Sequence, residues 1–366
     1  MSRRAKSAAS GLAAAAALGL CGGFLAGAPA SGPDAAIDPV PPLRQLIGQR
    51  IVYGFPGRRI PPRLLARVRR GEAGGVILFR RNIGSRGALR ALTRSLQAAA
   101  LASPARAPLL VMVDQEGGLV KRLSGAPRLS PAQMGRGAPG LAAVEGRATA
   151  HNLRSVGINV DLAPVVDVGR PGSATRRLGR SFGSRPSAVA ALGAAFARGL
   201  QGAGVAATLK HFPGLGAVRS DEDLLVQTVR ESLARLRRVD ERPFAVGTQA
   251  GARLVMTSTA RYPALGGGVA MLSRRVVTGE LRRHLRFGGE TLTDDLDVPA
   301  LRGRGGPVRL ALSAARAGND LLLFSNGSSA STAFAGLLRL AERGRLGEPG
   351  LRAAAGRVLA LRRSLR

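Results

Sequence analysis

Lys210 and His211 stand side by side at the end of an apolar run, and the chain is organised around them. The run Val205–Leu209 leads directly into the pair, and Phe212–Gly214 then ends regular structure and opens a polar loop. Three consecutive acids, Asp221–Asp223, follow in this loop. An apolar strand that delivers polar residues to a loop is the way in which a parallel barrel builds an active site.

Polar residues also follow three other apolar runs. Burying such charges costs on the order of several kcal/mol unless they are paired or used. We therefore predict a functional site, and the alternative is an internal ion-pair network, for example Asp114 with Arg122. The residues concerned are Asp114, Gln115, Glu116, Lys121 and Arg122 after the first of these runs, Asp167 and Arg180 after the second, and Asp294 and Asp295 after the third.

Short apolar runs alternate with longer amphipathic stretches along the chain, which predicts a βαβα order and a parallel sheet with helices outside. Eight such units at this length favour an α/β fold of the TIM-like (β/α)8 barrel type, as one catalytic domain. The predicted strands are 50–53, 75–79, 109–113, 158–162, 205–210, 253–257, 290–293 and 320–324. The predicted helices include 86–101, 144–156, 187–202, 225–238 and 273–285, with tail helices 332–343 and 350–363 packed on the outside.

The N-terminus has the pattern of a signal peptide. Three basic residues precede an apolar run, Gly11–Gly27, and Ala28-Pro29-Ala30 follows as a small-residue cleavage site. We predict a signal peptide over residues 1–30, a linker over 31–42 and the barrel domain over 43–366. The protein is expected to be exported and extracellular or cell-wall associated; an uncleaved membrane anchor is the weaker alternative. The one cysteine, Cys21, would leave with the leader.

The charge balance is strongly basic. The 366-residue chain carries a formal net charge of +33, and nearly all of the excess is arginine, because lysine occurs only at Lys6, Lys121 and Lys210. Scattered arginine is typical of solvated helix faces, although a basic surface also attracts anionic polymers such as those of a cell wall. With 3% aromatic residues and no tryptophan, the chain offers no stacking platform for bases, so we predict no nucleic-acid partner.

At these residues the sequence resembles the family 3 glycoside hydrolases, and within them the single-domain β-N-acetylglucosaminidases that act on cell-wall fragments. The resemblance extends over about residues 46–326, and six motifs in family order carry it. They are Gly54-Phe55-Pro56-Gly57, Asp114-Gln115-Glu116-Gly117-Gly118, Asp161-Leu162-Ala163-Pro164-Val165-Val166-Asp167-Val168, Gly179-Arg180-Ser181-Phe182-Gly183, Lys210-His211-Phe212-Pro213-Gly214 and Thr293-Asp294-Asp295-Leu296.

The resemblance implies a role for individual residues. Asp294 matches the catalytic aspartate and would be the nucleophile that forms a covalent glycosyl-enzyme. Sugar-binding positions of the family are matched by Asp114, Arg122, Arg180, Lys210 and His211. A carboxylate can attack an anomeric carbon, and fixed donors to sugar hydroxyls gain strength in an oxocarbenium-like transition state.

The acid/base loop departs from the family pattern. The family usually has a second histidine where Leu215 stands, and it ends the loop in Asp-Ser-His, whereas this chain has Asp221, Glu222 and Asp223. An aspartate has an ordinary pKa near 3.9, against about 6.5 for histidine, so Asp223 or Glu222 must hold a proton to act as an acid. Mutual repulsion of the three carboxylates raises at least one pKa. The alternative is that the acids are only a solvated loop.

Two functions therefore stay open on the sequence alone. The first is a retaining hydrolase that releases terminal β-linked N-acetylglucosamine from peptidoglycan-derived glycans. The second is a catalytically inactive relative that binds amino sugars or the cell wall. We predict no cofactor and no metal, because no cluster of ligand residues has metal-binding spacing, and no stable protein partner.

Overall fold

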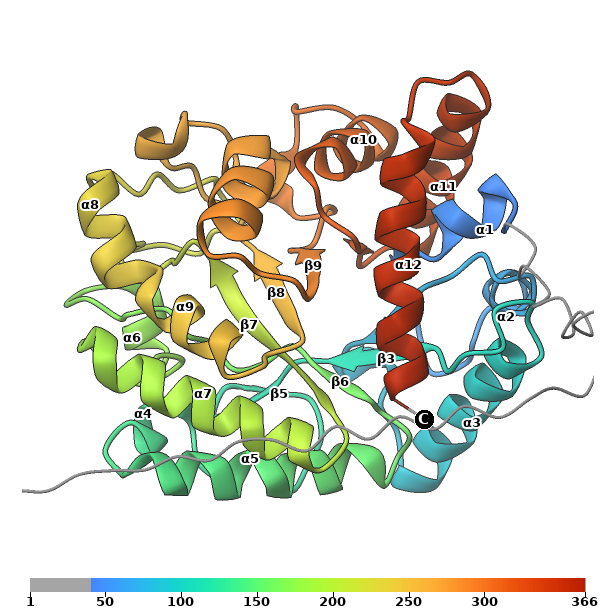
Figure 1. Ribbon diagram of the computed structural model, residues 1–366. Coiled ribbons are helices and arrows are strands. Elements are labelled where there is room, and N and C mark those ends of the chain that lie inside the picture. The colour runs from blue at the N-terminus through green and yellow to red at the C-terminus, as the bar shows by residue number, and fades with distance from the viewer. Residues whose placement is uncertain (1–40, 366) are drawn as a thin grey trace, which may run out of the picture. The chain divides into compact units, whose positions relative to one another are not determined.

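The computed structural model describes residues 41–365, and these residues form a barrel of eight parallel strands surrounded by helices (Figure 1). The strand order around the barrel is β10-β1-β2-β3-β6-β7-β8-β9. The predicted fold is confirmed, and every predicted strand is present with its ends shifted by at most two residues. The strands are β1 (Ile51–Tyr53), β2 (Gly75–Leu78), β3 (Leu110–Val113), β6 (Val160–Asp161), β7 (Ala206–Phe212), β8 (Leu254–Thr257), β9 (Glu290–Thr293) and β10 (Leu322–Phe324).

The barrel closes between β9 and β10. Thr293 N donates to Leu321 O at 3.1 Å and Leu296 N donates to Leu323 O at 2.9 Å, and Leu292 and Leu321 form a parallel bridge. Closure removes the free sheet edges, so every strand has a neighbour on both sides. The carboxyl ends of all eight strands consequently meet at one mouth.

Alternation along the strands divides the apolar residues into two layers. On β3, Leu110 and Met112 belong to the barrel interior, whereas Val111 and Val113 belong to the layer beneath the helices. Both faces of a parallel strand are covered, which is why the predicted strands are continuous apolar runs. The interior cluster also contains Val52, Ile77, Val160, Leu162, Ala206, Leu254, Met256, Leu292, Leu321 and Leu323.

The outer layer is helical, and α5 and α7 lie side by side along one flank (Figure 1). The main helices are α1 (Leu43–Gly48), α2 (Pro62–Arg69), α3 (Arg86–Leu101), α5 (Pro139–Arg154), α7 (Pro186–Gly202), α9 (Arg242–Gln249), α10 (Pro307–Ala317), α11 (Gly327–Glu342) and α12 (Glu348–Ser364). Short helices are α4 (Pro131–Met134), α6 (Ala174–Arg177), α8 (Leu233–Arg235), η1 (Arg80–Asn82), η3 (Pro263–Leu265), η4 (Ala270–Leu272) and η6 (Pro299–Leu301), and η2 (Leu236–Asp240) and η5 (Arg275–His284) are π-helical.

The helix predicted over 225–238 is wrong in its first half. Residues on either side of Thr228 run extended beside Arg261, with Val229 N donating to Arg261 O at 2.9 Å and Arg261 N donating to Gln227 O at 2.8 Å. Helix begins only at α8, where the side chain of Ser232 accepts a hydrogen bond from Arg235 N. The loop after β7 therefore continues from Pro213 to Ser232, long enough to cover the mouth of the barrel.

Helix α12 was predicted on the outside of the barrel, and this is also wrong. Its Val358 and Leu361 join the apolar cluster of the barrel interior. Arg362, which is buried, donates to the carbonyls of Ala107 and Pro108 just before β3. The helix thus closes the end of the barrel opposite the mouth, because its apolar stripe covers the interior left open there. The predicted leader, 1–30, lies outside the described residues.

Candidate active site

A pocket of about 460 Å³ lies at the carboxyl ends of the strands. Its apolar lining includes interior residues of the barrel, Ile77, Leu162, Met256 and Leu323. All the predicted site residues line it: Asp114, Arg122, Arg180, Lys210, His211, Asp221, Glu222, Asp223 and Asp294. The structure therefore brings together residues from the ends of β3, β7 and β9 and from the loop after β6.

Lys210 and His211 both face this pocket although they are consecutive in β7. In a regular strand, neighbouring side chains point to opposite faces. The pairing of β7 with β8 shifts in register between Leu209 and Phe212, and this irregularity allows both side chains to serve one site.

One side of the pocket is a network of paired charges. Lys210 Nζ lies 2.9 Å from Asp114 Oδ1 and 2.7 Å from Glu116 Oε1, and Arg122 donates to Asp114 Oδ2 at 3.2 Å. Arg180 binds Glu116 through two hydrogen bonds, of 2.8 and 2.9 Å. The predicted ion pair of Asp114 with Arg122 exists, but as part of a network that lines the pocket.

The pairing decides the charge state of these groups. Burial alone would raise the pKa of Asp114, but Lys210 and Arg122 outweigh it and the pKa is lowered. Burial is likewise outweighed at Glu116, whose pKa Arg180 and Lys210 hold well below its usual range. At neutral pH this side of the pocket therefore presents fixed donors and acceptors, which suit the binding of hydroxyl groups.

His211 is held by Asp167, a fully buried residue from the loop after β6. Asp167 Oδ2 lies 2.8 Å from His211 Nδ1, and Oδ1 accepts hydrogen bonds from the backbone N–H groups of His211 and Leu215. Because a carboxylate only accepts, Nδ1 is the donor and Nε2 is the nitrogen left for the pocket. Burial would lower the pKa of His211, but the charge of Asp167 outweighs it and the pKa is raised.

The opposite side of the pocket is acidic. Glu222, 7% exposed, brings a carboxylate oxygen to within 4.8 Å of an oxygen of Asp294 and of a ring nitrogen of His211. Burial raises the pKa of Glu222, the ring of His211 opposes this rise, and the charge of Asp294 adds to it, so the net shift is upward. Asp294 Oδ1 accepts a hydrogen bond from Asp295 N at 2.9 Å.

Asp223 and Asp221 stand at the rim, where both are exposed. Asp223 N donates to Asp221 Oδ1 at 3.0 Å, and Asp223 O accepts from Ala300 N at 2.9 Å, which ties the loop to the segment after β9. Partial desolvation, then the charges of Asp294 and the two neighbouring acids, raises the pKa of Asp223 to about 8. The acids are thus part of the pocket, not only a solvated loop.

Two residues of the site were noted among the polar residues after apolar runs but were given no catalytic or sugar-binding role. Glu116 neutralises Lys210 and Arg180, and Asp167 orients His211. Both stand in the motifs that follow β3 and β6. Their partners come from distant parts of the chain, so the sequence could not show the pairing. The only signal in the sequence was a polar residue after an apolar run.

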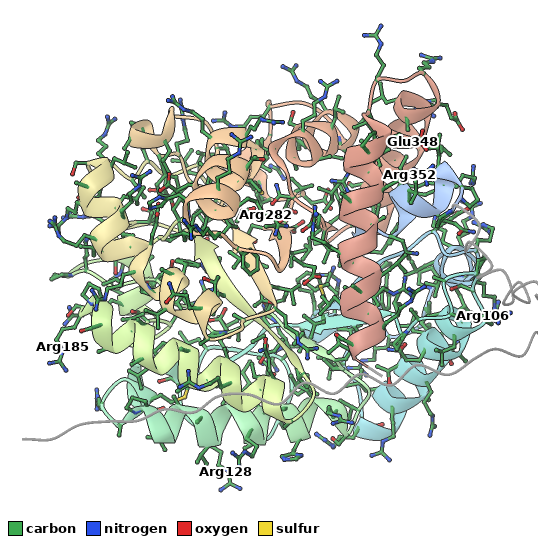
Figure 2. The ribbon with its side chains drawn as sticks, in the orientation of Figure 1. Arg106, Arg128, Arg185, Arg282, Glu348 and Arg352 are labelled. Atoms are coloured by element: carbon green, nitrogen blue, oxygen red, sulfur yellow. The ribbon has the colours of Figure 1, made fainter. Side chains whose placement is uncertain are left out.

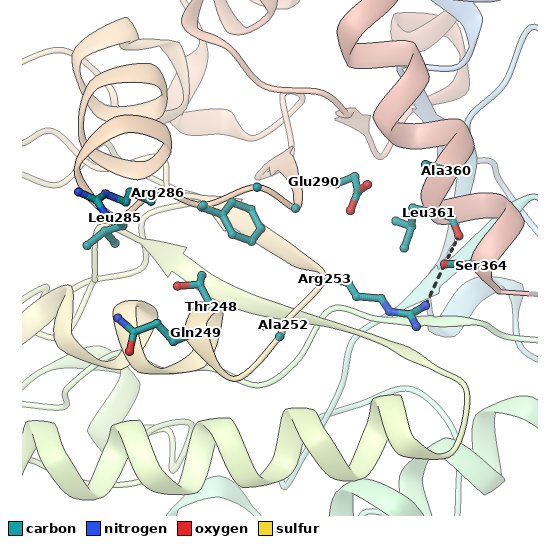
Figure 3. Close-up of a pocket in the computed structure, with 14 residues that line it drawn as sticks. Thr248, Gln249, Ala252, Arg253, Leu285, Arg286, Glu290, Ala360, Leu361 and Ser364 are labelled. Atoms are coloured by element: carbon teal, nitrogen blue, oxygen red, sulfur yellow. Dashed lines mark hydrogen bonds between the residues drawn. The ribbon is translucent and has the colours of Figure 1, made fainter. Parts of the chain in front are cut away.

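Another hollow, of about 560 Å³, lies near the opposite ends of β8 and β9 (Figure 3). There Arg253 donates to Ser364 Oγ of α12 at 3.0 Å, and Glu290 projects nearby. Burial and the charge of Asp320 raise the pKa of Glu290 to about 7. Residues at this end of a barrel generally serve stability, so we assign the chemistry to the mouth.

Two groups of side chains among residues 41–365 are close enough to hold a metal ion. One is His211, Glu222 and Asp294, which line the pocket at the mouth. The other is Glu241, Glu280 and His284 on the outer wall. In this second group Arg237 already donates to both oxygens of Glu280, at 2.6 and 3.0 Å, so a cation is in place there.

An eight-stranded barrel with two facing carboxyl groups and a polar pocket at its mouth is typical of glycoside hydrolases. Residues 46–361 match the glycosyl hydrolase family 3 N-terminal domain. The chain belongs to this family.

The relatives include β-hexosaminidases. The chain is 38% identical over 301 residues, 80% of this chain and 84% of the relative, to an "uncharacterized secreted glycosyl hydrolase" of Arthroderma benhamiae. It is 36% identical over 259 residues, 68% of this chain and 75% of the relative, to a β-hexosaminidase of Xanthomonas oryzae pv. oryzae.

Solved structures of family 3 enzymes have the same fold as this chain. A family 3 β-N-acetylglucosaminidase from Paenibacillus sp. str. FPU-7 superposes with a TM-score of 0.84 at 34% identity. The match covers 89% of this chain and 63% of that enzyme. A β-N-acetylhexosaminidase from Beutenbergia cavernae gives a TM-score of 0.80 at 30% identity, covering 88% of this chain and 99% of that one. Within residues 41–365, no helix has the length and apolar character needed to cross a bilayer.

Proposed function

We propose that the protein is a retaining β-N-acetylhexosaminidase that releases terminal β-linked N-acetylglucosamine from peptidoglycan-derived glycans. The observation that carries this proposal is the approach of Glu222 and Asp294 to within 4.8 Å at their nearest oxygens. Retaining enzymes separate their two carboxyl groups by about 5–5.5 Å, whereas inverting enzymes need roughly 6.5–9.5 Å to admit a water molecule.

Asp294 is the nucleophile of the proposed reaction. Its carboxylate attacks the anomeric carbon while an acid of the Asp221–Asp223 loop gives a proton to the glycosidic oxygen, and the alcohol leaves. Water then attacks the glycosyl-enzyme while the same loop residue takes a proton from the water. The free sugar is released and the Asp294 carboxylate is restored. Every proton and electron pair is returned in one turnover.

The paired side of the pocket binds the sugar. Lys210 and Arg180 present donors whose partners are fixed, and Asp114 accepts from hydroxyl groups while Lys210 and Arg122 hold it ionised. Because the pocket ends in the apolar interior of the barrel, it suits the end of a glycan chain, not its middle.

The first test is incubation with an aryl β-N-acetylglucosaminide that carries a good leaving group. We expect release of the phenol and a sugar adduct detectable by intact mass, both absent in Asp294→Ala. A folded protein that binds N-acetylglucosamine but gives neither signal would instead be the inactive binding protein that the sequence also allows.

Export and wall association belong to the same proposal. Figure 2 shows arginine side chains over the outer surface, for example Arg128 and Arg185, both exposed. Such a surface attracts anionic wall polymers, and the attraction weakens with salt. Pull-down with purified cell wall at about 0.05 and 0.5 M salt tests this, and retention that does not change with salt would contradict it.

A further inference from the structure

We infer that Glu222 is the general acid and base of this site, and that the ring of His211, held by Asp167, faces its carboxyl group. The inference rests on the proposed glycosidase function and deepens it by choosing among the three loop acids. The family resemblance would place the acid at Asp223, which stands where the family has histidine.

Depth in the pocket separates the two candidates. Glu222 is 7% exposed and reaches both Asp294 and His211, whereas Asp223 is exposed at the rim. An acid must lie within hydrogen-bonding reach of the bond that breaks beside the nucleophile. Glutamate is one methylene longer than aspartate, which lets the middle residue of the triplet reach inward.

Orientation separates them further. Catalytic acids and bases are commonly held by a third group. His211 faces Glu222 and is fixed by two hydrogen bonds to Asp167, one from its ring and one from its backbone N–H. Asp167 also accepts a hydrogen bond from the backbone N–H of Leu215. The hydrogen bonds of Asp223, in contrast, are made by its backbone, to Asp221 and Ala300.

A carboxyl group must keep its proton near neutral pH to act as an acid. A ring nitrogen of His211 lies within 4.8 Å of a carboxylate oxygen of Glu222. Burial and the charge of Asp294 raise the pKa of Glu222 and outweigh the opposing effect of His211, whose own pKa is raised by Asp167. The other charged groups facing the pair are Asp294, Arg180 and Asp223. Glu222 gives its proton to the leaving oxygen and recovers one from the attacking water.

The decisive experiment compares Glu222→Gln with Asp223→Asn on two substrates, an aryl glycoside with a good leaving group and a disaccharide with a poor one. Loss of a general acid costs roughly 10²–10⁴-fold, and the cost falls when the leaving group needs no proton. We expect Glu222→Gln to show this full loss on the disaccharide and a much smaller loss of the glycosylation step on the aryl substrate. Asp223→Asn should lower both rates by the same factor.

A positive signal accompanies the loss. Without its base, Glu222→Gln should accumulate the sugar adduct on Asp294, and sodium azide should release it as the β-glycosyl azide, because azide attacks without giving up a proton. Glu342→Gln, an exposed exchange on α11, is the matched control. If Glu222→Gln does not fold, Glu222→Ala is assayed in the same way with azide.

The outcomes distinguish the inference from the function beneath it. Absence of an adduct in the unmodified protein overturns the proposed glycosidase. A second outcome is an adduct in the unmodified protein together with leaving-group dependence and azide rescue in Asp223→Asn and not in Glu222→Gln. This outcome overturns only the assignment of Glu222.

Asp167→Asn tests the positioning role. It removes a negative charge from the Glu222–His211 pair, so the pair should lose its proton at lower pH. We expect the alkaline limb of kcat/KM for the disaccharide to move toward lower pH. A uniform loss across the whole pH range would mean that Asp167 serves only the structure.

Discussion

The pocket contains two sets of acids that differ in the cations beside them. Asp114 and Glu116 are matched by Lys210, Arg122 and Arg180, and their pKa values are lowered. The acidic set is Glu222, Asp223 and Asp294, and its nearest basic partner is His211. The pKa values of Glu222 and Asp223 are raised.

The difference assigns different work to acids of the same chemical type. A carboxylate with fixed cations stays ionised and keeps its geometry, which suits recognition of substrate. Carboxyl groups that crowd one another keep a proton into the neutral range, which suits proton transfer. Changes that remove either the charge or its partner should therefore have different consequences on the two sides.

The largest effect is expected from removing the nucleophile. Asp294→Ala should lower turnover by roughly 10⁴-fold or more, as the loss of a covalent nucleophile does, while binding of N-acetylglucosamine survives on the paired side. Steady-state assay and calorimetric titration measure the two quantities. Parallel loss of binding and turnover would contradict the separation of the two sides.

The next effect concerns stability. Lys210→Met leaves Asp114 and Glu116 partly unmatched in a buried site, and breaking a buried pair costs about 3–5 kcal/mol. The free energy of unfolding in urea should fall accordingly and sugar binding should be lost. The matched control is Lys121→Met, since Lys121 is half-buried and its side chain donates to the carbonyl of Pro127 and not to a carboxylate. Equal losses in the two variants would mean that the network is not what holds the mouth together.

The pH dependence of stability should reveal the crowded side. The pKa of Asp223 is about 8 in the folded protein, above its unfolded value near 3.9, so the folded state binds more protons between these values. The contribution of Asp223 to stability then falls as pH rises from about 4 to about 8 and is level outside that window. In Asp223→Asn this contribution disappears, so the melting temperature of the variant should rise relative to the parent from pH 4 to pH 9. A constant difference across that range would contradict the crowding.

The sequence predicted the barrel well, because parallel strands covered on both faces are apolar throughout and cannot be confused with solvated helices. Residues that line the pocket were expected because they follow strand ends, while the roles given to them came from the family resemblance and stay predictions. The sequence did not reveal that Glu222 lies deeper than Asp223, because that depends on how the loop is tied to Ala300 and turned around Asp167. The helix predicted over 225–238 failed for the same reason: pairing with Arg261, far along the chain, overrides local helical preference.

The smallest effect is expected at Glu241. It tests whether a raised carboxyl pKa is enough to make a residue catalytic. On the outer wall, Glu241 is buried with both carboxylate oxygens unpartnered and lies beside Glu280. Burial and the charge of Glu280 raise its pKa to about 9. This acid resembles those of the mouth, but its neighbour Glu280 is paired with Arg237.

Glu241→Gln should therefore change stability and not catalysis. A folded-state pKa near 9 against about 4.3 unfolded means that the parent loses stability as pH rises between those values. The amide avoids this loss and can donate to Glu280, so we expect a gain of about 1–3 kcal/mol at pH 8 and little at pH 4. Urea unfolding at both values, with kcat/KM measured alongside, checks this. A change in the pH profile of activity would contradict this expectation. It would mean that the ionisation of Glu241 on the outer wall affects the reaction at the mouth.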